Sequence, residues 1–427
     1  MFRTEHNLSE VPVVLLNNWV TKNQLTNNIP NKKWNVSSGV NNGFPIFSEE
    51  IAGTELFGSG TNTDPYRIST IANLKWMRDK VNNDNANYST RSYKLMADLD
   101  FAGTEDWIPI GATWENPFKG TFDGNGKVIR NINIGTIASP SKNELAGLFG
   151  CIGGGSVSNL GIGWKCIYTT GSVMHAGGIV GYNSGSVTHC FVFGQILTSC
   201  TGDASVGGIV GGNSGIINDC NSIGTFEGLS LTFGTIYSGG IAGNNYGTIS
   251  NSYHKGKITA SSTSQLVYSG GITGDNKNII FNCYAITHVF GNSGSSNCYS
   301  GGIAGRNERI LSNCYAAGTV NATVNATEPS CAAGGITGWN YTKGILTYCL
   351  ALNDTITSIS RSSHLYDLIN RIAYYTNGGT LQKNYAKSTM IMRMGSTISN
   401  LVNVSNKNGL NHGINIAEQP VAAEQLG

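Results

Sequence analysis

Charged side chains are scarce in this sequence. Lys, Arg, Asp and Glu make up 12% of the 427 residues, where about 25% is usual, and the formal net charge is +2. No long run of like charge occurs, so binding to nucleic acid or to a membrane surface through charge is not indicated. Because 40% of the residues are hydrophobic, the low charge is not that of a disordered chain. The sequence predicts a folded protein.

Long apolar runs are missing as well. No stretch approaches the roughly 20 apolar residues that cross a bilayer, so we expect no membrane span. The first residues, from Met1 to His6, lack the charged and apolar segments of a signal peptide. We therefore expect either a cytosolic protein or a mature or partial chain whose export signal was lost.

Glycine, in contrast, is abundant, with 57 residues, and much of it belongs to a repeat. The segment Gly-Gly-Ile-x-Gly-x-Asn recurs at a period of about 31 residues. Its copies begin at Gly177, Gly207, Gly239, Gly270, Gly301 and Gly334, with a degenerate copy at Ala146 and a late one at Asn370. Short apolar alternations broken by Gly and Asn are strand signals, and the unit contains no amphipathic helix. We interpret each unit as three short strands that form one rung of an all-β parallel β-helix, a solenoid. The β-propeller, with blades of about 40 residues, is the main competing fold.

Asparagine should form a column in such a solenoid. Equivalent residues stack one rung apart, at about 4.8 Å, and amide side chains can bond along the stack. The column comprises Asn183, Asn213, Asn245, Asn276, Asn307 and Asn340. We expect these residues to tolerate a left-handed turn, and the repeated glycines to take positive φ at corners and to allow close backbone approach. A row of ligand-binding amides is the alternative interpretation.

Cysteine forms a second column. Four residues, Cys190, Cys220, Cys283 and Cys314, lie thirteen positions after the first glycine of their copies. Small, buried stacking residues are the simplest interpretation. Disulfides stay open as an alternative, because the rung spacing allows the Cα separation, although parallel side chains give poor S–S geometry. No C-x-x-C pair is present, so we expect no metal site.

The segment before the repeats has a different character. Ser69 or Thr70 can cap a helix over 70–83, and such a helix would cover the open end of the solenoid. We therefore divide the chain into four parts. These are 1–48, the tail of a preceding module or an N-terminal extension; 49–145, the cap and first rungs; 146–387, the repeats; and 388–427, a C-terminal cap or tail.

The repeat resembles a known family. The unit followed by an Asn-Cys-Tyr triplet, as at 282–284 and 313–315, is similar to the GLUG repeat of bacterial surface proteins, notably those of Bacteroides-type gut bacteria. That repeat also occurs in the non-catalytic β-helical region of immunoglobulin-A-cleaving metallopeptidases. The lead-in segments 107–111 and 118–126 match as well. The resemblance implies a right-handed β-helix at the cell surface or outside the cell. Because the chain begins within a module of this kind, we expect it to be a fragment of something longer.

Catalytic groups are hard to find. The zinc-binding H-E-x-x-H of the metallopeptidases is absent. Polysaccharide lyases and glycosidases on β-helices need clustered carboxylates or bases, whereas the charges within these repeats are sparse and unaligned. The densest group, Arg306, Glu308 and Arg309, is most simply a solvated corner. We predict no enzyme activity, no cofactor and no metal.

Binding is the function that remains. Tyr182, Tyr246 and Trp339 lie in or beside the same turn of different copies and are candidate ligand contacts. We expect a structural, adhesin-like module that binds a host or dietary glycan or a protein. The alternatives are a β-helix polysaccharide lyase or glycosidase, and a non-catalytic fragment of an immunoglobulin A protease-like protein.

Overall fold

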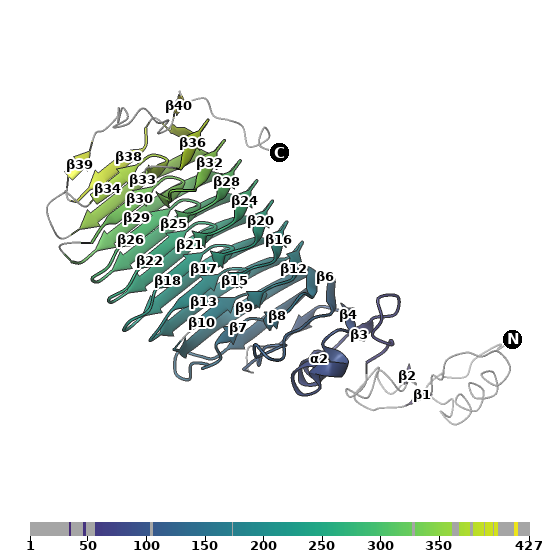
Figure 1. Cartoon of the computed structure of the whole chain (residues 1–427). Helices are drawn as coiled ribbons and strands as arrows, with labels where there is room; N and C mark the ends of the chain where they lie inside the picture. Colours follow the sequence, from purple (N-terminus) through teal and green to yellow (C-terminus); the bar gives the residue numbers. More distant parts are fainter. Residues whose placement is uncertain are drawn as a thin grey trace, which may run out of the picture.

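The computed structural model shows a stack of parallel β rungs (Figure 1). It describes residues 56–399, apart from 103–105, 173, 327–328, 361–366, 376–378, 388 and 396, together with β1 (Trp34–Asn35), β2 (Ile46–Phe47) and β40 (Ile414–Ile416). The proposed segment 1–48 and most of 388–427 lie outside the described residues.

Two eight-stranded parallel sheets run the length of the stack. Sheet 1 contains β7 (Leu145–Ala146), β10 (Met174–Gly177), β14 (Ala204–Gly207), β18 (Ile236–Gly239), β22 (Val267–Gly270), β26 (Cys298–Gly301), β30 (Cys331–Gly334) and β34 (Asp367–Asn370). Sheet 2 contains β8 (Phe149–Ile152), β11 (Val180–Asn183), β15 (Val210–Asn213), β19 (Ala242–Asn245), β23 (Thr273–Asn276), β27 (Ala304–Asn307), β31 (Thr337–Asn340) and β35 (Ala373–Tyr375).

Two further faces complete each rung. The short-strand face contains β3 (Tyr66–Ile68), β4 (Ser92–Leu95), β12 (Ser186–Thr188), β16 (Ile216–Asn218), β20 (Thr248–Ser250), β24 (Ile279–Phe281), β28 (Ile310–Ser312), β32 (Ile345–Thr347) and β36 (Thr380–Gln382). The long-strand face contains β13 (Phe191–Cys200), β17 (Asn221–Ser230), β21 (Tyr253–Ser262), β25 (Tyr284–Ser293), β29 (Tyr315–Val324) and β33 (Leu350–Ser360). β9 (Ser156–Gly171) pairs with β12 of the short-strand face and β13 of the long-strand face, and β6 (Thr121–Ile134) pairs with β4 and β9.

The first and last described rungs add five shorter strands. They are β5 (Leu99–Asp100), β37 (Tyr385–Lys387), β38 (Ile391–Met394), β39 (Thr397–Ser399) and the strand β40 given above. β5 pairs in parallel with β6, and β38 and β39 form an antiparallel pair.

The parallel β-helix predicted from the repeat is confirmed, but its rung differs from the prediction. Each rung has four strands, not three, and the fourth is long: β21 has 10 residues. The four-residue strand before each Gly-Gly pair escaped the sequence analysis, because it is too short for a clear alternation. The ladder is regular, since Val180 pairs with Val210 and Val210 with Ala242.

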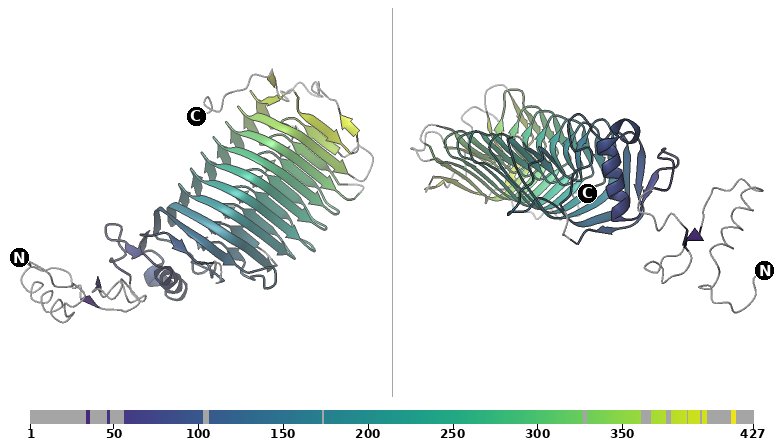
Figure 2. Two further views of the ribbon diagram at one scale, coloured as in Figure 1. Left: turned by 180° about the vertical axis from the view of Figure 1, so that it is seen from behind. Right: turned by 90° about the horizontal axis from the view of Figure 1, so that it is seen from below.

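A helix lies at the N-terminal end of the stack, as predicted (Figures 1 and 2). α2 (Ile71–Asn83) begins after Thr70, whose side chain accepts a hydrogen bond from the Asn73 N–H in a capping box, and it is followed by the short helix α3 (Asn85–Tyr88). Its buried residues Leu74, Met77 and Val81 pack into the apolar core. The helix thereby removes the apolar surface of the first rung from water.

The interior is apolar and repeats from rung to rung. The isoleucine of each Gly-Gly-Ile copy has no exposed surface, from Ile179 to Ile336. No described helix covers the outer faces, as the view from behind shows (Figure 2). Outward side chains of the four faces therefore decide what the solenoid presents to its surroundings.

The glycines of the Gly-Gly-Ile-x-Gly segment do not take the positive φ that we expected. Positive φ occurs at the corner before each long strand, in residues such as His189, Asp219 and Asn282, and in a column of glycines within the long strands, such as Gly224 and Gly256. The Gly-Gly pairs are needed for the close approach of neighbouring rungs. A Cβ on Gly240, for example, would lie 2.2 Å from the Gly271 carbonyl oxygen. The column from Asn183 to Asn340 is likewise free of left-handed residues.

Candidate functional site

The repeated asparagines form one hydrogen-bonded ladder inside the solenoid. The amide Nδ2 of each residue donates to Oδ1 of the next, at 2.8–2.9 Å, along Asn183, Asn213, Asn245, Asn276, Asn307 and Asn340. Each of the six is fully buried. Most of these Oδ1 atoms also accept a backbone N–H two residues further on, such as that of Gly247. A ligand has no access to this ladder, which holds the corner after sheet 2.

A second, exposed asparagine ladder was not predicted. Asn251, Asn282 and Asn313 take left-handed conformations at the corner before the long strands. The side-chain amides of Asn282 and Asn313 donate a hydrogen bond to the equivalent residue one rung earlier, and that of Asn251 donates to Asn218. Asn and Asp favour this conformation, because their short polar side chains tolerate it. The Asn-Cys-Tyr triplet contained the signal, but the period alone does not reveal backbone φ.

The cysteine column lies on the inner side of the same corner, the one before the long strands. The thiols of Cys190, Cys283 and Cys314 donate to the carbonyl oxygen two residues earlier, at 3.1–3.2 Å. Cys220 does so at 3.4 Å, and Ser252 takes the equivalent position with its hydroxyl. All ten cysteines are free thiols in the structure. Burial raises the pKa of the Cys220, Cys283 and Cys314 thiols, which disfavours their reactive thiolate form.

The outer sides of sheets 1 and 2 meet in an aromatic seam. Tyr237, Tyr268 and Tyr299 stack from rung to rung with centroids 5.3 and 5.5 Å apart, and Trp339 stacks on Tyr299 at 4.8 Å. Only 2% of Tyr268 is exposed. Since each ring face covers the next ring, the seam offers little aromatic surface to a sugar and acts as a second, smaller core.

The three aromatic residues proposed as ligand contacts lie in different surroundings. Trp339 belongs to the seam, and Tyr182 packs against Trp114 with ring centroids 4.8 Å apart. Tyr246 lies in the turn after β19, is 47% exposed, and accepts a hydrogen bond from Lys277. Tyr182 and Trp339 belong to the same outward column of sheet 2 but lie five rungs apart, so the structure does not gather the three residues into one site.

Two charges that looked unaligned in the sequence form a pair beside the seam. Asp275 on β23 and Arg306 on β27 are in register, and the guanidinium donates to both carboxylate oxygens at 2.5 and 2.9 Å. Arg306 also lies over Tyr268 and contacts Glu308. Asp275 has no exposed surface. Burial acts to lower the pKa of Arg306, but the hydrogen bonds and charge of Asp275 raise it overall. The expected solvated corner at Arg306 is thus a largely buried ion pair.

A serine and a histidine meet in the interior without forming a catalytic site. Ser222 Oγ lies 2.9 Å from Nδ1 of His254, which is fully buried. Burial lowers the pKa of His254 to about 3, so the imidazole is neutral. Because the pair lies among the interior side chains of β17 and β21, substrate cannot reach it.

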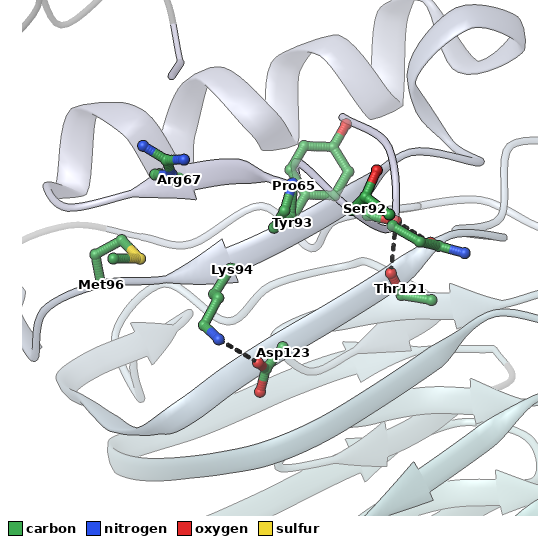
Figure 3. A pocket seen from close by; sticks show the side chains of 10 residues that line it. Pro65, Arg67, Ser92, Tyr93, Lys94, Met96, Thr121 and Asp123 are labelled. Carbon is green, nitrogen blue, oxygen red and sulfur yellow. Dashed lines mark hydrogen bonds and ion pairs between the residues drawn. The ribbon is translucent and has the colours of Figure 1, made fainter. Parts of the chain in front are cut away.

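A pocket of about 690 Å³, lined by charged, polar and apolar side chains, opens at the N-terminal end of the short-strand face (Figure 3). Its cations are neutralised: Lys94 lies 3.2 Å from Asp123, and Arg67 pairs with Asp64. Burial acts to raise the pKa of Asp123, but hydrogen bonds from Asn159 and the Asn125 N–H and the charge of Lys94 lower it overall. A charged ligand would have to compete with these pairs.

The long-strand face differs from all of these, because it is apolar and exposed. Outward positions along neighbouring strands carry large side chains that are 36–50% exposed: Phe191, Phe193, Ile223, Ile286 and Phe290. A ladder of half-buried rings, Tyr253, Tyr284 and Tyr315, lies beside them with centroids 4.7 and 4.8 Å apart. Phe191, Phe193 and Ile223 lie on the neighbouring strands β13 and β17, and large exposed apolar groups mark interaction sites. The sequence analysis did not single out these residues, because it expected only a short strand at this place in the rung.

Two further findings concern metal ions and membrane spans. Among the described residues, no group of three His, Cys, Asp or Glu side chains is placed to hold a metal ion. No helix in the described part of the chain is long and apolar enough to cross a membrane.

Parts of this chain are similar to known proteins. The family model described as the GLUG motif matches residues 296–321. Halomucin of Haloquadratum walsbyi is 29% identical over 157 residues, which is 34% of this chain and 2% of that protein. A putative Gly-rich membrane protein of Evansella cellulosilytica is 32% identical over 143 residues, which is 32% of this chain and 15% of that protein. The chain thus matches only a small part of the length of these relatives.

A solved structure is similar along most of the chain. It is described as a putative immunoglobulin A1 protease from Bacteroides ovatus, with 19% identity and a TM-score of 0.45 over 87% of this chain and 88% of that one. The matched motif, residues 296–321, covers β26 and most of β29 within one rung of the stack. This protein is therefore a parallel β-solenoid that carries the GLUG motif.

Proposed function

We propose that this chain is a non-catalytic binding module of an extracellular or cell-surface protein, and that its long-strand face binds glycan. The exposed apolar side chains of that face carry the proposal. Phe193 pairs with Ile223 on the next strand, and Ile286 is level with them two strands further on, with Lys255 of β21 between. A flat face of this regularity suits an extended ligand with a repeating structure.

The distribution of carboxylates supports a role without catalysis. General acid and base catalysis needs accessible carboxylates that face one another across a substrate. Asp275 is buried against Arg306, and Asp123 is engaged by Lys94 at the edge of the pocket. The long strands β13 to β29 contain a single carboxylate, that of Glu227. A polysaccharide lyase or glycosidase remains the runner-up and would require turnover by the isolated chain.

The proposed extracellular or cell-surface location is supported by the relatives of the chain. The names of the relatives, a halomucin and a putative Gly-rich membrane protein, support an extracellular or surface setting. The low charge and the repeated rungs are those of a rigid spacer or platform, which would hold the long-strand face away from its anchor.

A glycan array with the purified chain tests the proposal. The triple variant Phe193→Thr, Ile223→Thr and Ile286→Thr removes apolar surface while keeping strand propensity. The matched control Ile216→Thr, Ile310→Thr and Ile345→Thr changes three residues of similar exposure on the short-strand face. We expect glycan binding that only the first variant loses. Absence of binding to every glycan, or equal loss in both variants, would contradict the proposal.

A further inference from the structure

The centre of the long-strand face carries two lysines without carboxylate partners. Lys255 and Lys257 are exposed and lie on the same side of β21, because successive side chains of a strand alternate. Neither forms an ion pair with a carboxylate of the described residues. Glu227 is level with Thr259 rather than with either lysine.

The two ammonium groups lie over aromatic rings instead. Nζ of Lys255 is 5.5 Å from the ring centroid of Tyr253, and Nζ of Lys257 is 5.1 Å from that of Phe290. A ring face orients a cation but does not neutralise it. Lys387 and Lys94 differ, because each has a carboxylate within 3.2 Å, whereas the exposed Lys383 likewise lies over a ring, that of Tyr348. The long-strand face is therefore apolar with an unneutralised positive centre.

Polar groups surround that centre at rung spacing. His288 is level with Lys257 on the next strand, and its Nδ1 lies 2.9 Å from the Thr319 hydroxyl. The phenol groups of Tyr253, Tyr284 and Tyr315 are attached to a continuous stack of rings, so they recur once per rung. Because the ring faces cover one another, these tyrosines can offer hydroxyl groups and ring edges, but hardly a flat stacking platform.

We propose that the ligand of the long-strand face is an acidic polysaccharide, whose anionic groups contact Lys255 and Lys257. This inference rests on the proposed function and specifies its ligand class. A linear acidic glycan combines the three properties that the face complements: repeated negative charge, hydroxyl groups that bond to the phenols, and apolar ring faces that cover Ile223 and Ile286. A neutral glycan would leave the two ammonium groups without a counter-charge.

Two polysaccharides that differ in their charge test whether the face binds the carboxylates or the sugar backbone. Polygalacturonate and its methyl-esterified form share one backbone, and only the first has free carboxylates. We expect the full chain to bind polygalacturonate more tightly, and 0.5 M salt to remove most of the difference by screening. The double variant Lys255→Gln and Lys257→Gln should weaken binding of polygalacturonate about fivefold and leave that of the esterified polymer unchanged.

A control variant makes the same change in net charge outside the long-strand face. Lys119→Gln and Lys343→Gln replace two exposed lysines outside the long-strand face and should leave both affinities unchanged. Equal binding of both polymers, with loss only in the Phe193, Ile223 and Ile286 variant, would overturn the acidic ligand but keep the proposed function. Absence of binding to any glycan would overturn both. Binding of duplex DNA as tight as that of polygalacturonate would show a general polyanion site and overturn the glycan assignment.

Discussion

Two neighbouring columns of sheet 2 differ sharply. The last residue of the repeated segment is asparagine in six successive copies, and all six are buried in one ladder. The residue just before it points outward and changes in every copy, from Tyr182 and Gly212 through Asn244, Asp275 and Arg306 to Trp339. The inward asparagines take part in the same hydrogen-bonded ladder in every rung, whereas the outward position has no such constraint and its residue varies. Properties that distinguish this solenoid from others should therefore lie in the outward columns.

The largest effect is expected in the inward column. Asn245→Leu removes one rung of the ladder. It leaves the Gly247 N–H without its partner, and the Asn213 amide and Oδ1 of Asn276 each lose their shorter hydrogen bond. Each buried polar group left unpaired costs about 1–3 kcal/mol, so we expect the free energy of unfolding to fall by about 4 kcal/mol in urea titrations followed by circular dichroism. The neighbouring change Tyr246→Ala should cost less than about 0.5 kcal/mol, because the side chain is exposed. Equal losses would show that the ladder is not a special source of stability.

The outward column should be stabilising only where it is buried. Asp275→Asn weakens the pair with Arg306 and leaves that guanidinium with Glu308 as its remaining carboxylate partner. We expect a loss of about 3 kcal/mol, at the lower end for a broken buried pair. A double-mutant cycle with Arg306→Met measures the coupling. A coupling energy near zero would mean that the seam is held by aromatic stacking alone.

One interior residue makes stability depend on pH. The pKa of His254 is lowered by burial to about 3, below the value of about 6.5 for an unfolded chain. The unfolded state therefore binds one more proton between these values, and stability falls as the pH drops below about 6.5, by up to about 1.4 kcal/mol per pH unit. Urea titrations at pH 7, 6 and 5 should show a slope that is about one proton smaller in His254→Ala. An unchanged slope would mean that His254 is protonated in the folded state.

A substitution at a glycine where neighbouring rungs approach closely should lower the free energy of unfolding by a smaller amount. Gly240→Ala places a methyl group 2.2 Å from the Gly271 carbonyl oxygen, so we expect a loss of about 2 kcal/mol from overpacking. Gly126→Ala is the matched control, since nothing lies within 4 Å of its Cβ position and only its φ of +70° opposes the change. We expect a loss of about 1 kcal/mol there. A larger loss at Gly126 than at Gly240 would show that backbone conformation, and not rung spacing, selects glycine in the repeat.

The comparison also explains what could be predicted from the sequence. Inward columns repeat because every rung imposes the same contacts, so the solenoid and the asparagine stacking follow from the period. The helix after Thr70 is predicted from its capping residue. Outward residues carry no such signal. The ion pair between Asp275 and Arg306 depends on the register of β23 and β27, and the partners of Lys255 and Lys257 depend on where β21 lies in its sheet. The left-handed corner at Asn282 escaped prediction, because several residue types adopt that conformation and only the fold selects the position.

Binding of polygalacturonate to two surface variants tests the central claim most directly. The dissociation constant is measured for the unchanged chain, for the long-strand variant at Phe193, Ile223 and Ile286, and for the short-strand variant at Ile216, Ile310 and Ile345. We predict that all three chains unfold at the same urea concentration and that only the long-strand variant loses affinity. Full affinity in the long-strand variant would contradict the assignment of this face.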